Sequence, residues 1–227
     1  MWMRSTFFLL CLLGGVSPAT ELLDRMVANV NGHVILLSDW EDELRFESFM
    51  SGRDPAAISP DERKGALERL IDQELLREQM RLTDEKAVDP ARVQKQVESV
   101  KADYLREHGG ESWDAALARY HLSEKSLEER IGSELQQAQL IDTRFRPSVQ
   151  ISPADIESYY KEQLVPKLPV GDPVGLAEAT PKIREILVES KINQMLSSWL
   201  ETLRSQAQIR IVSRDSDKGP ASEGTTQ

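Results

Sequence analysis

Histidines are the residues of this chain best suited to acid–base or metal chemistry. The sequence of 227 residues has three of them, His33, His108 and His121. A general base with its partner, or a metal centre, needs several such side chains to meet at one point. Each of these histidines lies beside a glycine turn or at the end of an expected helix. We therefore interpret them as solvated terminal positions and expect no functional cluster.

The other residue types that could perform catalysis do not form a recognisable pattern. The acidic runs Glu41-Asp42-Glu43 and Glu128-Glu129 are more typical of solvated helix faces than of paired catalytic carboxylates. No HExxH, P-loop, dinucleotide-binding glycine or GxSxG pattern is present. Cys11 is the only cysteine and lies in an expected signal peptide, so thiol chemistry and disulfides are excluded from the mature chain. The sequence predicts no catalytic residue, no metal and no cofactor, and therefore not an enzyme.

Aromatic and methionine side chains are the remaining candidates for a functional surface. They are Phe46, Phe49, Met50, Tyr104 and Trp113. One interpretation is that they pack in the core. The other is that they form an exposed, adaptable apolar groove that contacts unfolded polypeptides, since methionine suits promiscuous binding and exposed apolar patches mark interaction sites. The sequence leaves both interpretations open, and these five residues are our candidate client contacts.

The elements that would position these residues begin with a hairpin. Met26–Val30 and Val34–Leu37 are rich in β-branched and apolar residues, and Asn31-Gly32 favours a two-residue type I′ turn. A lone hairpin is barely stable in water, so it needs a further strand or a helix. Gln208–Val212 is the one good candidate for a third strand, and we expect it to pair with the hairpin.

Helices account for most of the remaining pattern. Ser38 is expected to cap the first, with Glu41 completing a capping box. Four later starts share a capping residue followed by proline at the first helical position: Ser59-Pro60, Asp89-Pro90, Ser152-Pro153 and Thr180-Pro181. The apolar stripe after Pro181 contains Ile183, Ile186, Leu187, Met195, Leu196, Trp199, Leu200 and Leu203. The predicted fold class is mostly α, with a small antiparallel sheet made of the N-terminal hairpin and the C-terminal strand.

The two ends of the chain and its charge restrict location and partners. Residues 1–19 resemble a secretory signal peptide cleaved near Ala19, which predicts a periplasmic protein; a retained anchor is the alternative. The apolar run is too short for a stable membrane span. Residues 213–227 lack apolar periodicity and predict a disordered tail. The net charge of −10 argues against nucleic acid and anionic lipid surfaces as partners.

Several segments of the sequence resemble one known family. They are DRMVANVNGHVILLSDWEDELR at 24–45, ALERLIDQELLREQ at 66–79, EERIGSELQQAQLIDTRFR at 128–146, ISPADIESYY at 151–160, and KIREILVESKINQMLSSWLETLRSQAQIRIV at 182–212. In order and spacing they are similar to SurA-like periplasmic chaperones and their PpiC-type prolyl-isomerase relatives. The resemblance implies that residues 20–164 form the N-terminal part of a chaperone domain, which residues 181–212 complete.

The sequence departs from those relatives in one respect. Where they commonly carry a parvulin domain of about a hundred residues, this chain has only a Pro/Gly-rich connection over residues 165–180, too short for a folded domain. Our favoured hypothesis is an exported, ATP-independent holdase that binds unfolded or nascent exported polypeptides. A dedicated assembly factor with one partner is the second hypothesis, and a prolyl isomerase is the least favoured. The sequence leaves the oligomeric state open.

Overall fold

The computed structural model describes residues 24–83, 87–167 and 174–212, so the expected signal peptide and the expected disordered tail lie outside the described residues. The strands are β1 (Met26–Val30), β2 (His33–Leu36) and β3 (Ile209–Ile211). The α-helices are α1 (Leu37–Met50), α2 (Pro60–Thr83), α3 (Pro90–Glu107), α4 (Trp113–Arg119), α5 (Glu124–Phe145), α6 (Pro153–Tyr159) and α7 (Leu176–Gln206). Short 3₁₀ or π turns cover Pro55–Ala57, Arg146–Ser148, Tyr160–Leu164 and Val165–Lys167. The predicted fold class, mostly α with a small antiparallel sheet, is confirmed.

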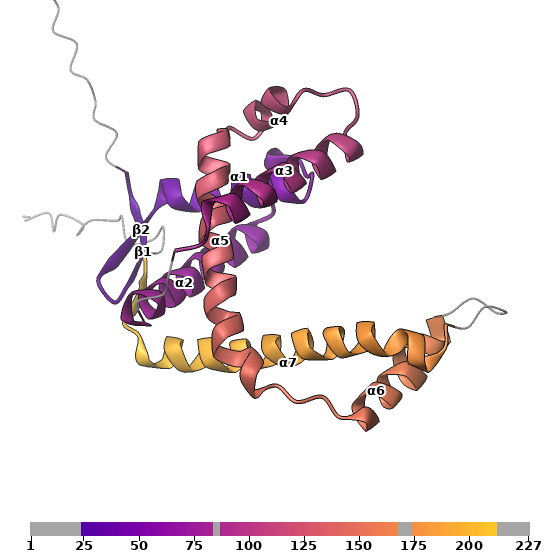
Figure 1. Ribbon diagram of the computed structural model, residues 1–227. Coiled ribbons are helices and arrows are strands. Elements are labelled where there is room, and N and C mark those ends of the chain that lie inside the picture. Colours follow the sequence, from indigo (N-terminus) through magenta and orange to yellow (C-terminus); the bar gives the residue numbers. More distant parts are fainter. Residues whose placement is uncertain (1–23, 84–86, 168–173, 213–227) are drawn as a thin grey trace, which may run out of the picture.

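The sheet joins the two ends of the described chain. Its strand order is β2-β1-β3, and both pairings are antiparallel (Figure 1). Asn31 and Gly32 form the predicted turn with positive φ angles of 51° and 92°, which these two residue types tolerate best. The backbone N–H of Gln208 donates to Asn31 Oδ1 over 2.7 Å, and that of Val212 donates to Val27 O over 2.9 Å. The predicted pairing of the C-terminal strand with the hairpin is confirmed.

This pairing predicts a measurable loss on truncation. A chain that ends at Ala207 is expected to be less stable than one that ends at Val212 by about 2–3 kcal/mol, since the β3 ladder and the packing of Ile209 on the α2 side of the sheet disappear together. Urea denaturation of the two chains measures the difference. Equal midpoints would contradict a stabilising role for β3.

Three of the four predicted helix starts are confirmed. The caps of α2, α3 and α6 accept from backbone N–H groups: Ser59 from Glu62 over 3.2 Å, Asp89 from Ala91 over 2.9 Å, and Ser152 from Asp155 over 3.2 Å. In each helix the proline follows its cap directly, where a missing N–H costs nothing.

The fourth predicted start, at Thr180-Pro181, is wrong. Helix α7 begins at Leu176, and Pro181 is its sixth residue. The helix extends toward its N-terminus because Leu176 and Ala179 pack in one cluster with Ile156 of α6, and this burial offsets the hydrogen bond that proline cannot make. The expected boundary between a connection over 165–180 and a helix from 181 therefore does not hold.

The predicted cap of the first helix is also wrong. Strand β2 runs into α1 without a loop, so the helix begins at Leu37 and its cap is Leu36. The carboxylate of Asp39 accepts from the Leu36 N–H over 2.8 Å, which is the role that we expected of Glu41. Ser38 instead donates its hydroxyl to the carboxylate of Asp24.

Two main clusters of apolar side chains contact α1, one near its beginning and one near its end. The first joins the sheet to α2 and consists of Val27, Ala28, Val30, Ile35, Leu67, Leu70, Ile71 and Leu75. The second joins α1, α3, α4 and α5. Helix α5 runs from this second cluster down to α7, and α7 extends from the sheet to α6 (Figure 1).

Helix α7 contacts the rest of the fold along its length, and Ile192 near its middle is 3% exposed. Near the sheet, Arg204 donates to Asp72 Oδ1 and Glu68 Oε2 of α2, each over 2.6 Å. The predicted apolar stripe is only partly buried, because Ile186 and Met195 are exposed to solvent. Trp199, which we expected in the core, is half-buried and packs edge-on against Phe145. Within the described ranges, none of the helices combines the length and the apolar composition needed to cross a membrane.

Candidate functional site

Four of the five predicted client-contact residues lie in a closed core. The exposed fractions are 6% for Phe46, 1% for Phe49, 6% for Tyr104 and 7% for Trp113. Phe49 stacks on Tyr104 with ring centroids 5.0 Å apart and meets Trp113 edge-on at 5.8 Å. Helices α1, α3 and α4 supply these rings, and the rings shield one another from solvent. These four side chains are therefore packed in the core and not exposed on an open groove, and Met50 alone among the five is exposed, at 49%. Whether any of the five contacts a client stays a prediction.

The phenol of Tyr104 is neutral within the aromatic core. Burial raises the pKa of Tyr104 to about 12, with a smaller contribution from the nearby Tyr120 and Glu111. Its hydroxyl donates to Glu111 Oε2 over 3.2 Å. The Tyr104 hydroxyl thus has a partner within the fold and stays protonated at physiological pH, whereas the buried Nε1 of Trp113 has no hydrogen-bond partner among the described residues.

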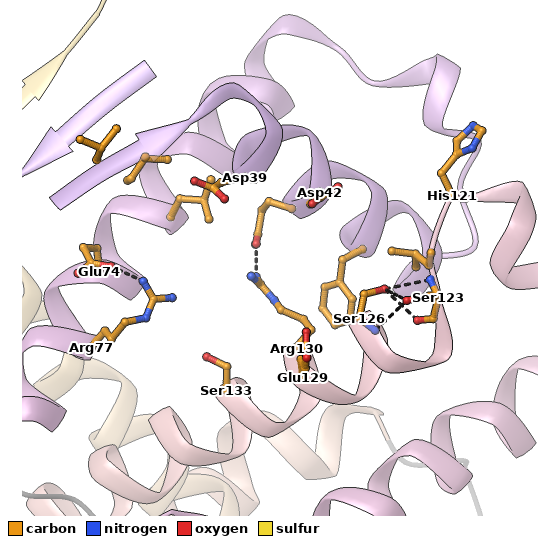
Figure 2. Close-up of a pocket in the computed structure, with 16 residues that line it drawn as sticks. Asp39, Asp42, Glu74, Arg77, His121, Ser123, Ser126, Glu129, Arg130 and Ser133 are labelled. Carbon is orange, nitrogen blue, oxygen red and sulfur yellow. Dashed lines mark hydrogen bonds and ion pairs between the residues drawn. The ribbon is translucent and has the colours of Figure 1, made fainter. Parts of the chain in front are cut away.

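A second surface, which the sequence did not indicate, is an open cleft of about 690 Å³ between β2, α1, α2 and α5 (Figure 2). Its apolar lining consists of Val34, Ile35, Phe46, Leu70 and Leu122. Val34 is half exposed, although it is part of a strand. The cleft therefore offers apolar contact area that solvent can reach.

A buried ion pair crosses the cleft from α1 to α5. Arg130 projects from α5 into the cleft (Figure 2). Its guanidinium binds the carboxylate of Glu43. Glu43 is only 3% exposed, and burial raises its pKa while the charge of Arg130 opposes that rise. The guanidinium also lies over the ring of Phe46, 5.1 Å from its centroid. Our interpretation of Glu41-Asp42-Glu43 as a solvated acidic face is thus wrong for Glu43.

The sequence indicates one partner of this ion pair, Glu43, but not the other. Glu43 and Phe46 are three residues apart and so share one helix face, and an acidic residue on an apolar face suggests a buried charge. Its partner Arg130 lies 87 residues further along the chain, where nothing in the local pattern points back to α1.

A second buried carboxylate of the cleft, that of Glu74, forms ion pairs with two arginines. Glu74 of α2 is 6% exposed and binds the guanidinium of Arg77 and that of Arg81, the latter over 3.1 Å. His33 Nδ1 lies 3.8 Å from the same carboxylate. The buried charges of the cleft are thereby compensated, whereas the carboxylates of Asp39, Asp42 and Glu129 on its rim remain exposed.

The histidines do not form a catalytic group. His121 lies at the end of the cleft opposite Glu74 and Arg77 (Figure 2). His108 stacks on Tyr104 with centroids 4.3 Å apart, in the aromatic core. Across residues 24–83, 87–167 and 174–212, no three histidine, aspartate, glutamate or cysteine side chains are placed to hold a metal ion together.

The fold and the cleft define a class: a helical domain, closed by a sheet from both ends of the chain, with an open mixed apolar and charged cleft. Comparison with protein families places the chain within this class more narrowly. The family of SurA-like N-terminal domains matches residues 3–141. The chain belongs to the SurA-like N-terminal domain family. A search of curated proteins found no match.

Proposed function

We propose that this protein is an ATP-independent chaperone of the cell envelope that holds unfolded exported polypeptides. The observation that carries the proposal is the open cleft of about 690 Å³, whose apolar lining is bordered by exposed carboxylates. Membership of the SurA-like N-terminal domain family supports a chaperone-type function. The signal-peptide pattern of residues 1–19 supports export to the periplasm.

The geometry of the cleft suits a weakly held, variable client. Its volume lies in the range of well-formed binding pockets, but its charged rim and half-exposed Val34 leave it accessible from solvent. Such a surface makes many modest contacts to an extended segment instead of enclosing one rigid ligand. Affinity then comes from apolar area, and sequence discrimination is low.

The direct test is aggregation of a chemically denatured outer-membrane protein on dilution, followed by light scattering. The chain from Thr20 onward is expected to suppress the scattering without ATP. Unchanged scattering at a several-fold excess of the chain would overturn the proposal.

Val34 provides a matched test of the cleft itself. Val34→Gln is expected to raise the amount of chain needed for half-maximal suppression about threefold, because an exposed apolar contact inside the cleft is lost. Leu82→Gln is the control, since Leu82 is 73% exposed on α2 and does not line the cleft. Equal effects of the two substitutions would mean that general surface apolarity, and not the cleft, holds the client.

We also propose that the chain does not catalyse prolyl isomerisation. The family match is to the N-terminal domain, without a match to a parvulin domain. The residues between Tyr160 and Leu176 are too few for a folded domain, which needs at least about 50. A proline-peptide isomerisation assay is expected to give the uncatalysed rate, and a rate well above it would overturn this part of the proposal.

A further inference from the structure

A small pocket of about 200 Å³ lies where the C-terminal ends of α1 and α3 meet. Aromatic and thioether groups of Phe49, Met50, Tyr104 and His108 line it, together with the carboxylate-bearing residues Asp103 and Glu107. It is distinct from the cleft between β2, α1, α2 and α5, because the two share no lining residue.

Helical spacing in α3 builds one wall of this pocket. Val100, Asp103, Tyr104 and Glu107 follow one another at intervals of three or four residues and so share one face. Tyr104 stacks between Phe49 and His108, so its ring is fixed from both sides.

The loop after α1 closes the opposite side of the pocket. Gly52 has a φ of +64°, and a Cβ at this position would lie 3.3 Å from His108 Nε2. Glycine therefore permits both the turn and the close approach of the backbone to the imidazole.

The charges around the pocket are opposite in sign to those that helix C-terminal ends favour. The C-terminal end of a helix carries partial negative charge, and cations are favoured there. Helix α1 has no basic residue in its last turn, and α3 has only Arg106, which binds Asp103 over 2.7 Å. Within the described residues, Glu107 makes no hydrogen bond or ion pair. Arg106 compensates Asp103, so in the described part of the chain the Glu107 carboxylate and the two helix ends are the negative charges left without a cation beside the aromatic rings.

We propose that this pocket accepts one lysine or arginine side chain of an extended client polypeptide. The aliphatic stem lies against Met50 and the ring edges, and the cationic end reaches Glu107 and competes with Arg106 for Asp103, as long basic side chains do when an apolar surface has a charged rim. A volume of about 200 Å³ is small for a drug-sized ligand and suits a single long side chain. The proposal rests on the proposed function for its client but adds a preference that the cleft does not supply.

The test compares two fluorescently labelled, unstructured peptides of glycine, serine and leucine. They differ only at the central position, which is lysine in one and norleucine in the other. Fluorescence anisotropy with the chain from Thr20 onward is expected to give about fivefold tighter binding of the lysine peptide, as a partly exposed ion pair near helix ends provides. Raising the salt concentration from low to about 1 M is expected to reduce this ratio toward one, because exposed charges are then screened.

Charge-neutral variants locate the preference. Asp103→Asn combined with Glu107→Gln is expected to reduce the ratio of the two affinities to nearly one. Glu98→Gln combined with Glu128→Gln is the control, because it removes the same charge from exposed positions outside the pocket and is expected to keep the ratio. A wild-type ratio near one, or an equal fall of the ratio in the two double variants, would overturn the proposal that this pocket binds a basic side chain.

Failure of this inference can be told apart from failure of the proposed function. If the chain suppresses aggregation of the denatured outer-membrane protein but does not discriminate between the peptides, the pocket does not bind a basic side chain and the chaperone proposal stands. If it neither suppresses aggregation nor binds either peptide, both proposals fall.

Discussion

Replacement of Phe49 by alanine is expected to lower the free energy of unfolding by about 3–5 kcal/mol. Phe49 is 1% exposed and stands at the centre of the aromatic core, within 6 Å of three other rings: Tyr104 at 5.0 Å, Tyr120 at 5.5 Å and Trp113 at 5.8 Å between centroids. Alanine removes its apolar area and leaves a cavity that α1, α3 and α4 cannot fill without moving. Urea denaturation followed by circular dichroism measures the loss.

Met50 is the matched control for this experiment. It follows Phe49 directly in α1 but is 49% exposed, so Met50→Ala is expected to cost less than about 1 kcal/mol. A loss as small for Phe49→Ala as for Met50→Ala would contradict the closed aromatic core. It would also revive the groove interpretation, in which Phe49 faces solvent and awaits a client.

The contrast between Phe49 and Met50 shows why the sequence left the candidate site open. Neighbouring residues on a helix point about 100° apart, so at most one of them can face the core squarely. Which one does so depends on where Tyr104 and Trp113 lie, and these come from α3 and α4, far along the chain. Composition and periodicity within α1 carry no information about that placement.

Most elements specified by short-range chemistry were predicted well, with the exception of the Ser38 cap of α1. The Asn31-Gly32 turn and the caps Ser59, Asp89 and Ser152 each depend on residues within a few positions of one another. The pairing of β3 with β1 is long-range, yet it was predictable because few other segments could complete the sheet.

Two other errors arose where tertiary packing overrides a local rule. Pro181 is a good first residue of a helix, but burial of Leu176 and Ala179 against α6 extends α7 beyond it. Glu43 has the surroundings of a solvated acidic run, but α5 approaches and covers it with Arg130. In both cases the deciding contact comes from a different element of the fold.

Substitution of Arg130 by methionine is expected to be as damaging as the loss of Phe49. Methionine preserves a long apolar side chain over Phe46 but leaves the carboxylate of Glu43 buried without its cation. Removing one partner of a buried ion pair typically costs about 3–5 kcal/mol, because the remaining charge keeps its full desolvation penalty. Denaturation at neutral pH is expected to show a loss of that size.

The pH dependence of this loss tests whether charge causes it. Glu134 acts in the same direction as Glu43, because burial raises its pKa and Arg130, 3.7 Å away, opposes the rise. Burial already raises the pKa of Glu43 above its ordinary value of 4.5, and Arg130 is the group that opposes the rise, so the pKa in the Arg130→Met variant is higher still. A carboxyl whose pKa is raised by folding binds its proton more tightly in the native state. Its contribution to stability is therefore fully present below 4.5 and is lost as the pH rises through the native-state pKa. The difference between wild type and variant is expected to be larger at pH 7 than at pH 4.

Removing the charge of Glu43 as well as that of Arg130 separates the effect of the ion pair from that of packing. Glu43→Leu combined with Arg130→Met takes both ions out of the junction of α1 and α5 and leaves apolar side chains of similar size. Replacement of a whole buried pair by apolar groups is often neutral or stabilising, so the double variant is expected to regain most of the stability that Arg130→Met loses. Its stability relative to wild type should also depend much less on pH than that of the single variant. If the double variant were as unstable as the single one at both pH values, the loss would come from disrupted packing around Phe46, and the ion pair would contribute little to joining α1 to α5.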